Sequence, residues 1–173
     1  MSNSTKFYIA VDSIWKNTKA LVGQAEWTQG YGSDGARWLS PLAIDGVTTG
    51  MNLCIDSFPR APVLRFSISL IYETSICRLD FWKNDRHLNH AVKGVRTPPN
   101  IQLGWLFGSH LHSWEDNKML INSNSGSKEL EFAVPIPERV KSFDAAFRYF
   151  CDVANIIVPT SEMPNLPRRD TLL

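Results

Sequence analysis

Strict alternation of apolar and polar residues in segment 63–72, VLRFSISLIY, constrains the fold of this chain more than any other feature. Successive side chains of a β-strand point to opposite faces, so the pattern predicts a strand with one buried face. The apolar positions are Leu64, Phe66, Ile68 and Leu70, and the polar positions are Arg65, Ser67 and Ser69. Glu73 and Thr74 can turn the chain into a second strand, so the segment predicts an antiparallel pair.

The second predicted strand, 75–82 (SICRLDFW), carries charged residues at alternate positions. Ile76, Arg78, Asp80 and Trp82 share one face, and Cys77, Leu79 and Phe81 share the other. We expect the Cys77 face to point into the core. Arg78 and Asp80 would then lie together on the opposite face.

More strands are expected on either side of this pair, and their turns are marked in the sequence. They fall at 25–29, 36–44, 47–58, 101–114 (one long strand or two short ones) and 129–134. Asp45-Gly46 is a strong hairpin signal between the second and third of these. Segment 83–100 is polar and ends in two prolines, so it predicts a long loop.

Two helices are expected, one near each end of the chain. Segment 7–11 fits a short strand, but we favour a helix that begins near residue 12 and ends at Gly23. After Pro137, apolar residues recur at three- and four-residue steps, which is the stripe of an amphipathic helix. That stripe consists of Val140, Phe143, Phe147, Phe150, Cys151 and Ala154.

Strands followed by a closing helix, without β-α-β alternation, predict an α+β fold. We expect an antiparallel β-sheet with the C-terminal amphipathic helix packed on one face and a short N-terminal helix. The length of 173 residues suits a single domain, 1–173, with flexible or extended tails at 1–6 and 160–173.

Composition and charge indicate a globular protein of the cytoplasm. Hydrophobic residues make up 43% of the chain, and the net charge of +1 implies no whole-molecule attraction to nucleic acid or membrane. The three cysteines, Cys54, Cys77 and Cys151, are far apart and in apolar segments, which predicts buried free thiols in a reducing compartment. No signal peptide and no membrane-spanning apolar run are found.

All four histidines lie within segment 77–114, as His87, His90, His110 and His112. On a strand, His110 and His112 would share a face across Leu111. They would meet Arg78 and Asp80 if the two strands are neighbours, with His87 in the connecting segment. This clustering makes the segment the candidate site.

Three interpretations of this cluster remain open from the residues alone. Two histidines and a carboxylate could bind a catalytic metal ion with one coordination position open. Alternatively, two histidines could act as base and acid in metal-free phosphodiester cleavage, with arginine stabilising the phosphate charge. In the third interpretation, the histidines only make structural hydrogen bonds. We favour cleavage over metal binding, and we therefore expect no metal and no cofactor.

The same motifs carry a resemblance to a known family. They are Arg78-Leu79-Asp80, His87-x-Asn89, His110-Leu111-His112 and a closing helix with Phe-x-x-Phe-Cys and Asn-Ile. The chain resembles a family of small bacterial and phage proteins of unknown function, which is distantly similar to TumE-type toxins of toxin–antitoxin pairs. This chain departs from the family pattern at His90, Lys93 and Trp114, where proline, aspartate and tyrosine are usual.

The resemblance and the cluster together predict a nucleic-acid-processing protein of the toxin–antitoxin or phage–host conflict type that cleaves RNA without a metal. We expect His110 and His112 to act as acid and base. Arg78 would stabilise the phosphate, Asp80 would orient an imidazole, and His87 would assist.

Further residues are expected to contact partners. Trp82, Lys83 and Trp114 are candidates for nucleic-acid binding, because exposed tryptophans can stack on bases. The expected partners are RNA and an antitoxin or other protein of a defence system. An alternative function is a non-catalytic protein-interaction module, an inhibitor or accessory subunit of a defence or anti-defence complex, since aromatic residues also anchor protein interfaces.

Overall fold

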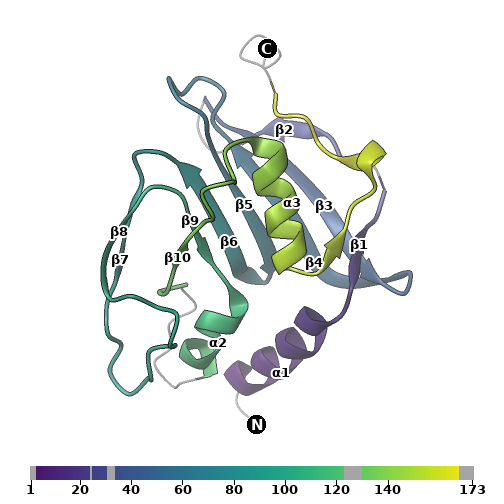
Figure 1. Cartoon of the computed structure of the whole chain (residues 1–173). Coiled ribbons are helices and arrows are strands. Elements are labelled where there is room, and N and C mark those ends of the chain that lie inside the picture. Colours follow the sequence, from purple (N-terminus) through teal and green to yellow (C-terminus); the bar gives the residue numbers. More distant parts are fainter. Residues whose placement is uncertain (1–2, 24, 31–33, 123–129, 168–173) are drawn as a thin grey trace.

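The computed structural model describes residues 3–23, 25–30, 34–122 and 130–167, and these form an α+β fold (Figure 1). The helices are α1 (Asn3–Lys16), α2 (Trp114–Asn122), α3 (Phe143–Val153) and a 3-10 turn, η1 (Thr160–Glu162). The strands are β1 (Lys19–Leu21), β2 (Trp27–Gln29), β3 (Ala36–Ile44), β4 (Val47–Ser57), β5 (Arg65–Tyr72), β6 (Thr74–Trp82), β7 (Arg86–Asn89), β8 (Gly104–Phe107), β9 (His110–His112), β10 (Val134–Pro135) and β11 (Ile156–Ile157).

Most strands belong to one sheet with the order β10-β9-β6-β5-β4-β3-β1-β11, in which β2 also pairs with β3. Its pairs are antiparallel except for β1 and β11, which are parallel. A second, two-stranded sheet pairs β7 with β8. The predicted α+β class is confirmed. Among the described helices, none has the length and apolar character needed to cross a membrane.

The hairpin predicted at Asp45-Gly46 is confirmed, because Ile44 pairs with Val47 across it. Asp45 has φ 50° and Gly46 has φ 78°. Positive φ at both central residues is the geometry of the tight hairpin turn that Asp-Gly favours. The next hairpin, from β5 to β6, turns at Glu73, which also has a positive φ of 58°.

One face of the main sheet packs against α3, which lies across the sheet in Figure 1. Phe143 meets Phe66 of β5 edge-on, with ring centroids 5.2 Å apart. The predicted apolar stripe of this helix is buried, as expected. The helix begins at Phe143 and not just after Pro137, because the Ser142 hydroxyl accepts a hydrogen bond from the Ala145 amide at 3.2 Å and caps it.

The N-terminal segment differs from the expectation. Helix α1 begins at Asn3, so the expected tail at 3–6 and the start near residue 12 are wrong. Val11 and Trp15 are buried in the core, and this packing stabilises the helix rather than the alternative strand at 7–11. The helix ends at Lys16 and not at Gly23, and the chain continues as β1.

The segments on either side of His110 also differ from the expectation. The predicted loop at 83–100 contains β7, which pairs with β8. The predicted strand 101–114 stops at His112, because the Ser113 hydroxyl accepts a hydrogen bond from the Asp116 amide at 3.1 Å and begins α2. Of the predicted strand 129–134, residue 129 lies outside the described residues and only Val134 pairs, within β10.

The segment after Pro159 packs more closely than an extended tail. Residues 160–162 form η1, and Met163 and Leu166 pack against the core. The Trp27 indole donates a hydrogen bond to the Asn165 carbonyl at 2.8 Å, which ties this segment to β2. The last part of the predicted tail, 168–173, lies outside the described residues.

Candidate functional site

Strands β6 and β9 are paired neighbours, and this pairing builds the candidate site. Arg78 lies opposite His112, and Asp80 lies opposite His110. Between these pairs, Leu79 and Leu111 point into the core, so alternation places the four polar side chains on the other face. The structure therefore brings together the four residues that the sequence singled out. Ile76 was expected on the same face, but a register shift in β6 puts it in the core instead.

The Asp80 carboxylate lies at the centre of this group. Its Oδ2 accepts a hydrogen bond from Arg78 Nε at 2.8 Å. The same oxygen lies 3.6 Å from His110 Nε2 and 3.7 Å from His112 Nε2. Arg78 Nη2 is 3.4 Å from His112 Nε2. The group therefore forms a continuous polar cluster, with Asp80 between the guanidinium and both imidazoles.

His87 joins this cluster from the second sheet. Within β7 and β8, His87 lies opposite Leu106, while Leu88 and Trp105 point to the other side and are exposed. The His87 ring is 5.4 Å from that of His110 and 4.7 Å from that of His112. Each of the three rings offers a nitrogen, and these nitrogens lie within 4.8 Å of one another. We call His87, His110 and His112 the histidine triad.

Backbone carbonyls orient two of the three rings. His110 Nδ1 donates to the Gly108 carbonyl at 2.9 Å, and His87 Nε2 donates to the Glu131 carbonyl at 2.8 Å. Because a carbonyl only accepts, each neutral ring carries its proton on that nitrogen and a lone pair on the other. Among the described residues, His112 Nδ1 makes no hydrogen bond of good geometry, although the Phe132 backbone lies close enough to the ring to favour its charged form. Its Nε2 faces the guanidinium of Arg78, which only donates.

Two asparagines hold the backbone that orients the triad. The Asn89 side chain bonds to both the amide and the carbonyl of Ala133, each at 2.9 Å. The Asn117 side chain does the same for Phe132, at 2.8 and 2.9 Å. Together they fix segment 131–133, whose first carbonyl receives the His87 hydrogen bond. Sequence reasoning did not assign these roles to the asparagines.

Asp85 is a further candidate that sequence reasoning did not propose. Its carboxylate lies with Asp80 and His110 in a second group whose ligand atoms are within 4.8 Å of one another. Asp85, His87 and Asn89 occupy alternate positions at and within β7. That alternation is the local signal for a strand here, and the polar composition of segment 83–100 obscures it.

His112 is fully buried, and this limits its chemistry. Burial lowers the pKa of His112 to about 2, and the nearby Arg78 charge adds to the effect. His110 and His87 act in the same direction, while the Phe132 backbone acts in the opposite one. His112 is therefore neutral near pH 7 and cannot deliver a proton to a substrate there. The predicted division of acid and base between His110 and His112 is not supported by this geometry.

The three residues predicted to contact nucleic acid differ in how far they are exposed. Trp114 is fully buried and its indole bonds to Asp12 at 3.3 Å, so the prediction that it stacks on bases is wrong. Trp82 is half-buried, and the Arg65 guanidinium lies over its ring at 4.5 Å. The same guanidinium lies 4.4 Å from the Phe58 ring. Lys83 is exposed directly after Trp82.

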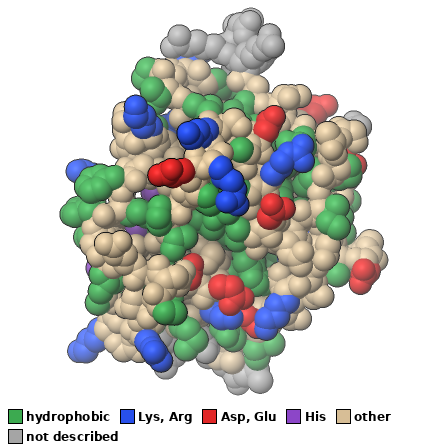
Figure 2. Space-filling view, in the orientation of Figure 1, with side chains coloured by type: hydrophobic (Ala, Val, Ile, Leu, Met, Phe, Trp, Pro, Cys, Tyr) green, Lys and Arg blue, Asp and Glu red, His purple; other side chains and the backbone are tan. Residues whose placement is uncertain are grey.

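Histidine side chains are largely covered in the view from the α3 side. In Figure 2, hydrophobic side chains gather where Figure 1 places β7 and β8, and histidine shows only in small patches between them. Exposed Leu88, Trp105 and Phe107 belong to these strands. The second sheet therefore has an inner face that carries His87 and an outer face that carries these three apolar side chains together with Arg86, whose guanidinium lies 5.5 Å from the Trp105 ring.

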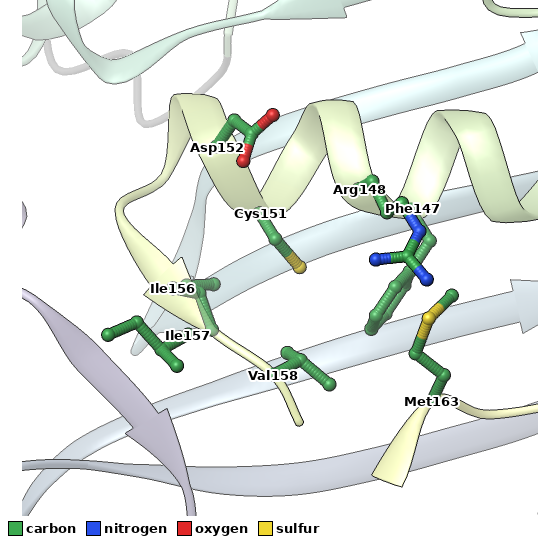
Figure 3. A pocket seen from close by; sticks show the side chains of 8 residues that line it. All are labelled: Phe147, Arg148, Cys151, Asp152, Ile156, Ile157, Val158 and Met163. Carbon is green, nitrogen blue, oxygen red and sulfur yellow. The ribbon is translucent and has the colours of Figure 1, made fainter. Parts of the chain in front are cut away.

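A hollow of about 420 Å³ lies elsewhere, between α3 and β11 (Figure 3). It is lined by Phe147, Arg148, Cys151, Asp152, Ile156, Ile157, Val158 and Met163. Burial raises the pKa of the Cys151 thiol to about 12, so the thiol stays protonated near pH 7 and is not an activated nucleophile. All three cysteines are buried and free, as predicted.

No family model matches this chain, and comparisons with curated proteins and with solved structures also give no match. The resemblance to TumE-type toxins therefore stays a prediction, and the function must be argued from the site itself.

Proposed function

We propose that this chain cleaves RNA at the cluster formed by the histidine triad, Arg78 and Asp80. The observation that carries the proposal is the cross-strand pairing of Arg78 with His112 and of Asp80 with His110, with His87 facing both. Phosphodiester cleavage needs a cation at the phosphate and a base at the attacking hydroxyl. The cluster supplies both within a few ångströms.

Arg78 is the residue best placed to bind phosphate. Its side chain is 40% exposed, whereas His110 and His112 lie beneath it in the interior. A guanidinium can hold phosphate oxygens through two parallel hydrogen bonds. In the free protein the Asp80 carboxylate accepts a hydrogen bond from Arg78 Nε. This bond keeps the Arg78 side chain directed toward the triad.

The stack of Arg65 with Trp82 and Phe58 is suited to binding a neighbouring nucleotide. Trp82 is two residues from Asp80 on β6, and strand alternation places both on the same face, about 7 Å apart. Aromatic rings and guanidinium planes stack on bases with little sequence preference. Single-stranded RNA is therefore the substrate class that suits this surface.

The test is cleavage of single-stranded RNA by the purified chain. Arg78→Gln is expected to lower the cleavage rate about 100-fold or more, because it removes the phosphate-binding charge. The matched control is Arg37→Gln, which breaks a comparable arginine–aspartate pair with Asp56 on the same sheet face, with Arg37 three strands from Asp80. The control should cleave at the parent rate. Absence of cleavage by the parent chain, or full activity of Arg78→Gln, would refute the proposal.

A second candidate function is a protein-interaction module, such as an inhibitor or accessory subunit in a defence complex. The observation that favours it is the apolar outer face of β7 and β8, where Leu88, Trp105 and Phe107 are 41%, 57% and 73% exposed. Aromatic residues of this kind anchor interfaces. A stoichiometric complex with the product of a neighbouring gene should be lost in Trp105→Ser/Phe107→Ser and kept in His87→Ala. Retention of the complex in the double variant would exclude this face.

A further inference from the structure

We propose that His87, His110 and His112 bind one divalent transition-metal ion of the zinc class, with Asp80 as the adjacent oxygen donor. The triad offers three ring nitrogens within 4.8 Å of one another. Imidazole nitrogens bind zinc at about 2.0–2.1 Å, which places nitrogens of a tetrahedral site about 3.3 Å apart. The rings therefore need to close by about 1.5 Å at most.

The hydrogen bonds around the triad are those of preformed metal ligands. A metal-bound histidine normally donates its second ring N–H to a carbonyl or carboxylate, which fixes the ring and directs the lone pair at the metal. His110 does this with the Gly108 carbonyl and His87 does it with the Glu131 carbonyl. Asn89 and Asn117 in turn hold segment 131–133. The positions of the lone pairs are thus set by backbone that is itself fixed.

The contacts between Asp80 and the two buried imidazoles are long. The Asp80 carboxylate is 3.6 and 3.7 Å from the two buried imidazoles, too far for good hydrogen bonds. Buried polar groups in proteins nearly always find partners. A metal ion would occupy the lone pairs that the present contacts leave unused.

The positive charge of Arg78 opposes cation binding, and its removal therefore gives a further test of the site. Its Nη2 lies 3.4 Å from His112 Nε2, so a bound ion must displace it. The side chain is 40% exposed and can turn toward solvent, where a phosphate could engage it. Removing this charge should therefore tighten metal binding, by about tenfold for unit charges a few ångströms apart.

This inference stands apart from the proposed cleavage of RNA, since a metal site can exist without that activity. Three histidines leave a fourth position for water, and a zinc-bound water ionises near pH 7. In that arrangement the metal-bound hydroxide would be the base at the site, in place of a histidine. This replaces our expectation from the sequence that the site works without a metal.

The test is titration of the chelator-treated full chain with Zn²⁺, and with Co²⁺ as a spectroscopic substitute that reports nitrogen coordination. The parent chain should bind one equivalent. His87→Ala, at the half-buried ligand, should weaken binding at least tenfold, and Arg78→Gln should tighten it. His90→Ala is the matched control, because His90 is a nearby exposed histidine outside the triad, and it should bind as the parent does.

Less than one equivalent bound by the parent chain, or parent-like affinity in His87→Ala, would overturn the metal site. Circular dichroism of each variant separates loss of a ligand from loss of the fold. RNA cleavage by a parent chain that binds no zinc would overturn the metal site and leave the proposed function standing. Zinc binding without RNA cleavage would support the metal site and refute the proposed function.

Discussion

The burial of His112 predicts a specific loss of stability in acid. Its pKa in the folded chain is about 2, against 6.5 for an unperturbed histidine. Below pH 6.5 the His112 imidazole is protonated in the unfolded chain but stays neutral in the folded chain. The free energy of unfolding therefore falls as pH falls. Each pH unit inside this window costs about 1.4 kcal/mol, which gives about 2 kcal/mol between pH 7 and pH 5.

That loss can be isolated by comparing two histidine variants. For a chain of this length, about 2 kcal/mol corresponds to a fall of about 4–8 °C in Tm between pH 7 and pH 5. The measurement is urea and thermal unfolding in excess chelator, so that metal binding does not contribute. His112→Gln should lose most of this pH dependence whatever its stability at pH 7, whereas His90→Gln, at an exposed site, should keep it. Equal pH dependence in the parent and His112→Gln would refute the reasoning.

Three further substitutions test how the fold supports the site, each by urea unfolding at neutral pH. Lys19→Met should cost about 1–3 kcal/mol, because the buried ammonium donates to three carbonyls at the end of α1, and an unchanged midpoint would contradict this. Ser142→Ala should cost about 1 kcal/mol through loss of the α3 cap, and Ser142→Gly should restore part of it. Asn89→Ala should cost about 2–3 kcal/mol and also weaken zinc binding about tenfold, because it releases the backbone that orients His87; unchanged zinc affinity would separate Asn89 from the site.

The parts of the fold that the sequence predicts well are those decided by local periodicity. The alternation in β5 and β6 determines which face is buried, and the Asp45-Gly46 signal determines a hairpin. The same reasoning placed Arg78 and Asp80 on one face and His110 and His112 on another strand. It could not show that β6 and β9 pair, because 27 residues separate the ends of these strands and no local signal specifies the partner.

The errors fall where tertiary contacts override a local pattern. Trp114 follows the alternating segment 110–112 and was predicted to be exposed at a strand end, but it is buried at the start of α2, where its indole donates a hydrogen bond to Asp12. The Ser113 cap was a local signal for that helix and was not used. The role of segment 131–133 could not be predicted at all, since its backbone is held by side chains of Asn89 and Asn117 from distant elements.

Stability alone does not explain three imidazoles between the main sheet and the second sheet. Burying His112 costs free energy in acid. A leucine at 112 would fill a similar volume without this cost. Strained or unsatisfied groups in native proteins concentrate at functional sites, where the cost is offset elsewhere in the fold. Burial prevents His112 from taking up a second proton, and it keeps the neutral imidazole fixed in position. A metal ligand needs both properties. They therefore favour three histidines that bind one metal ion together over histidines that act separately as acid and base.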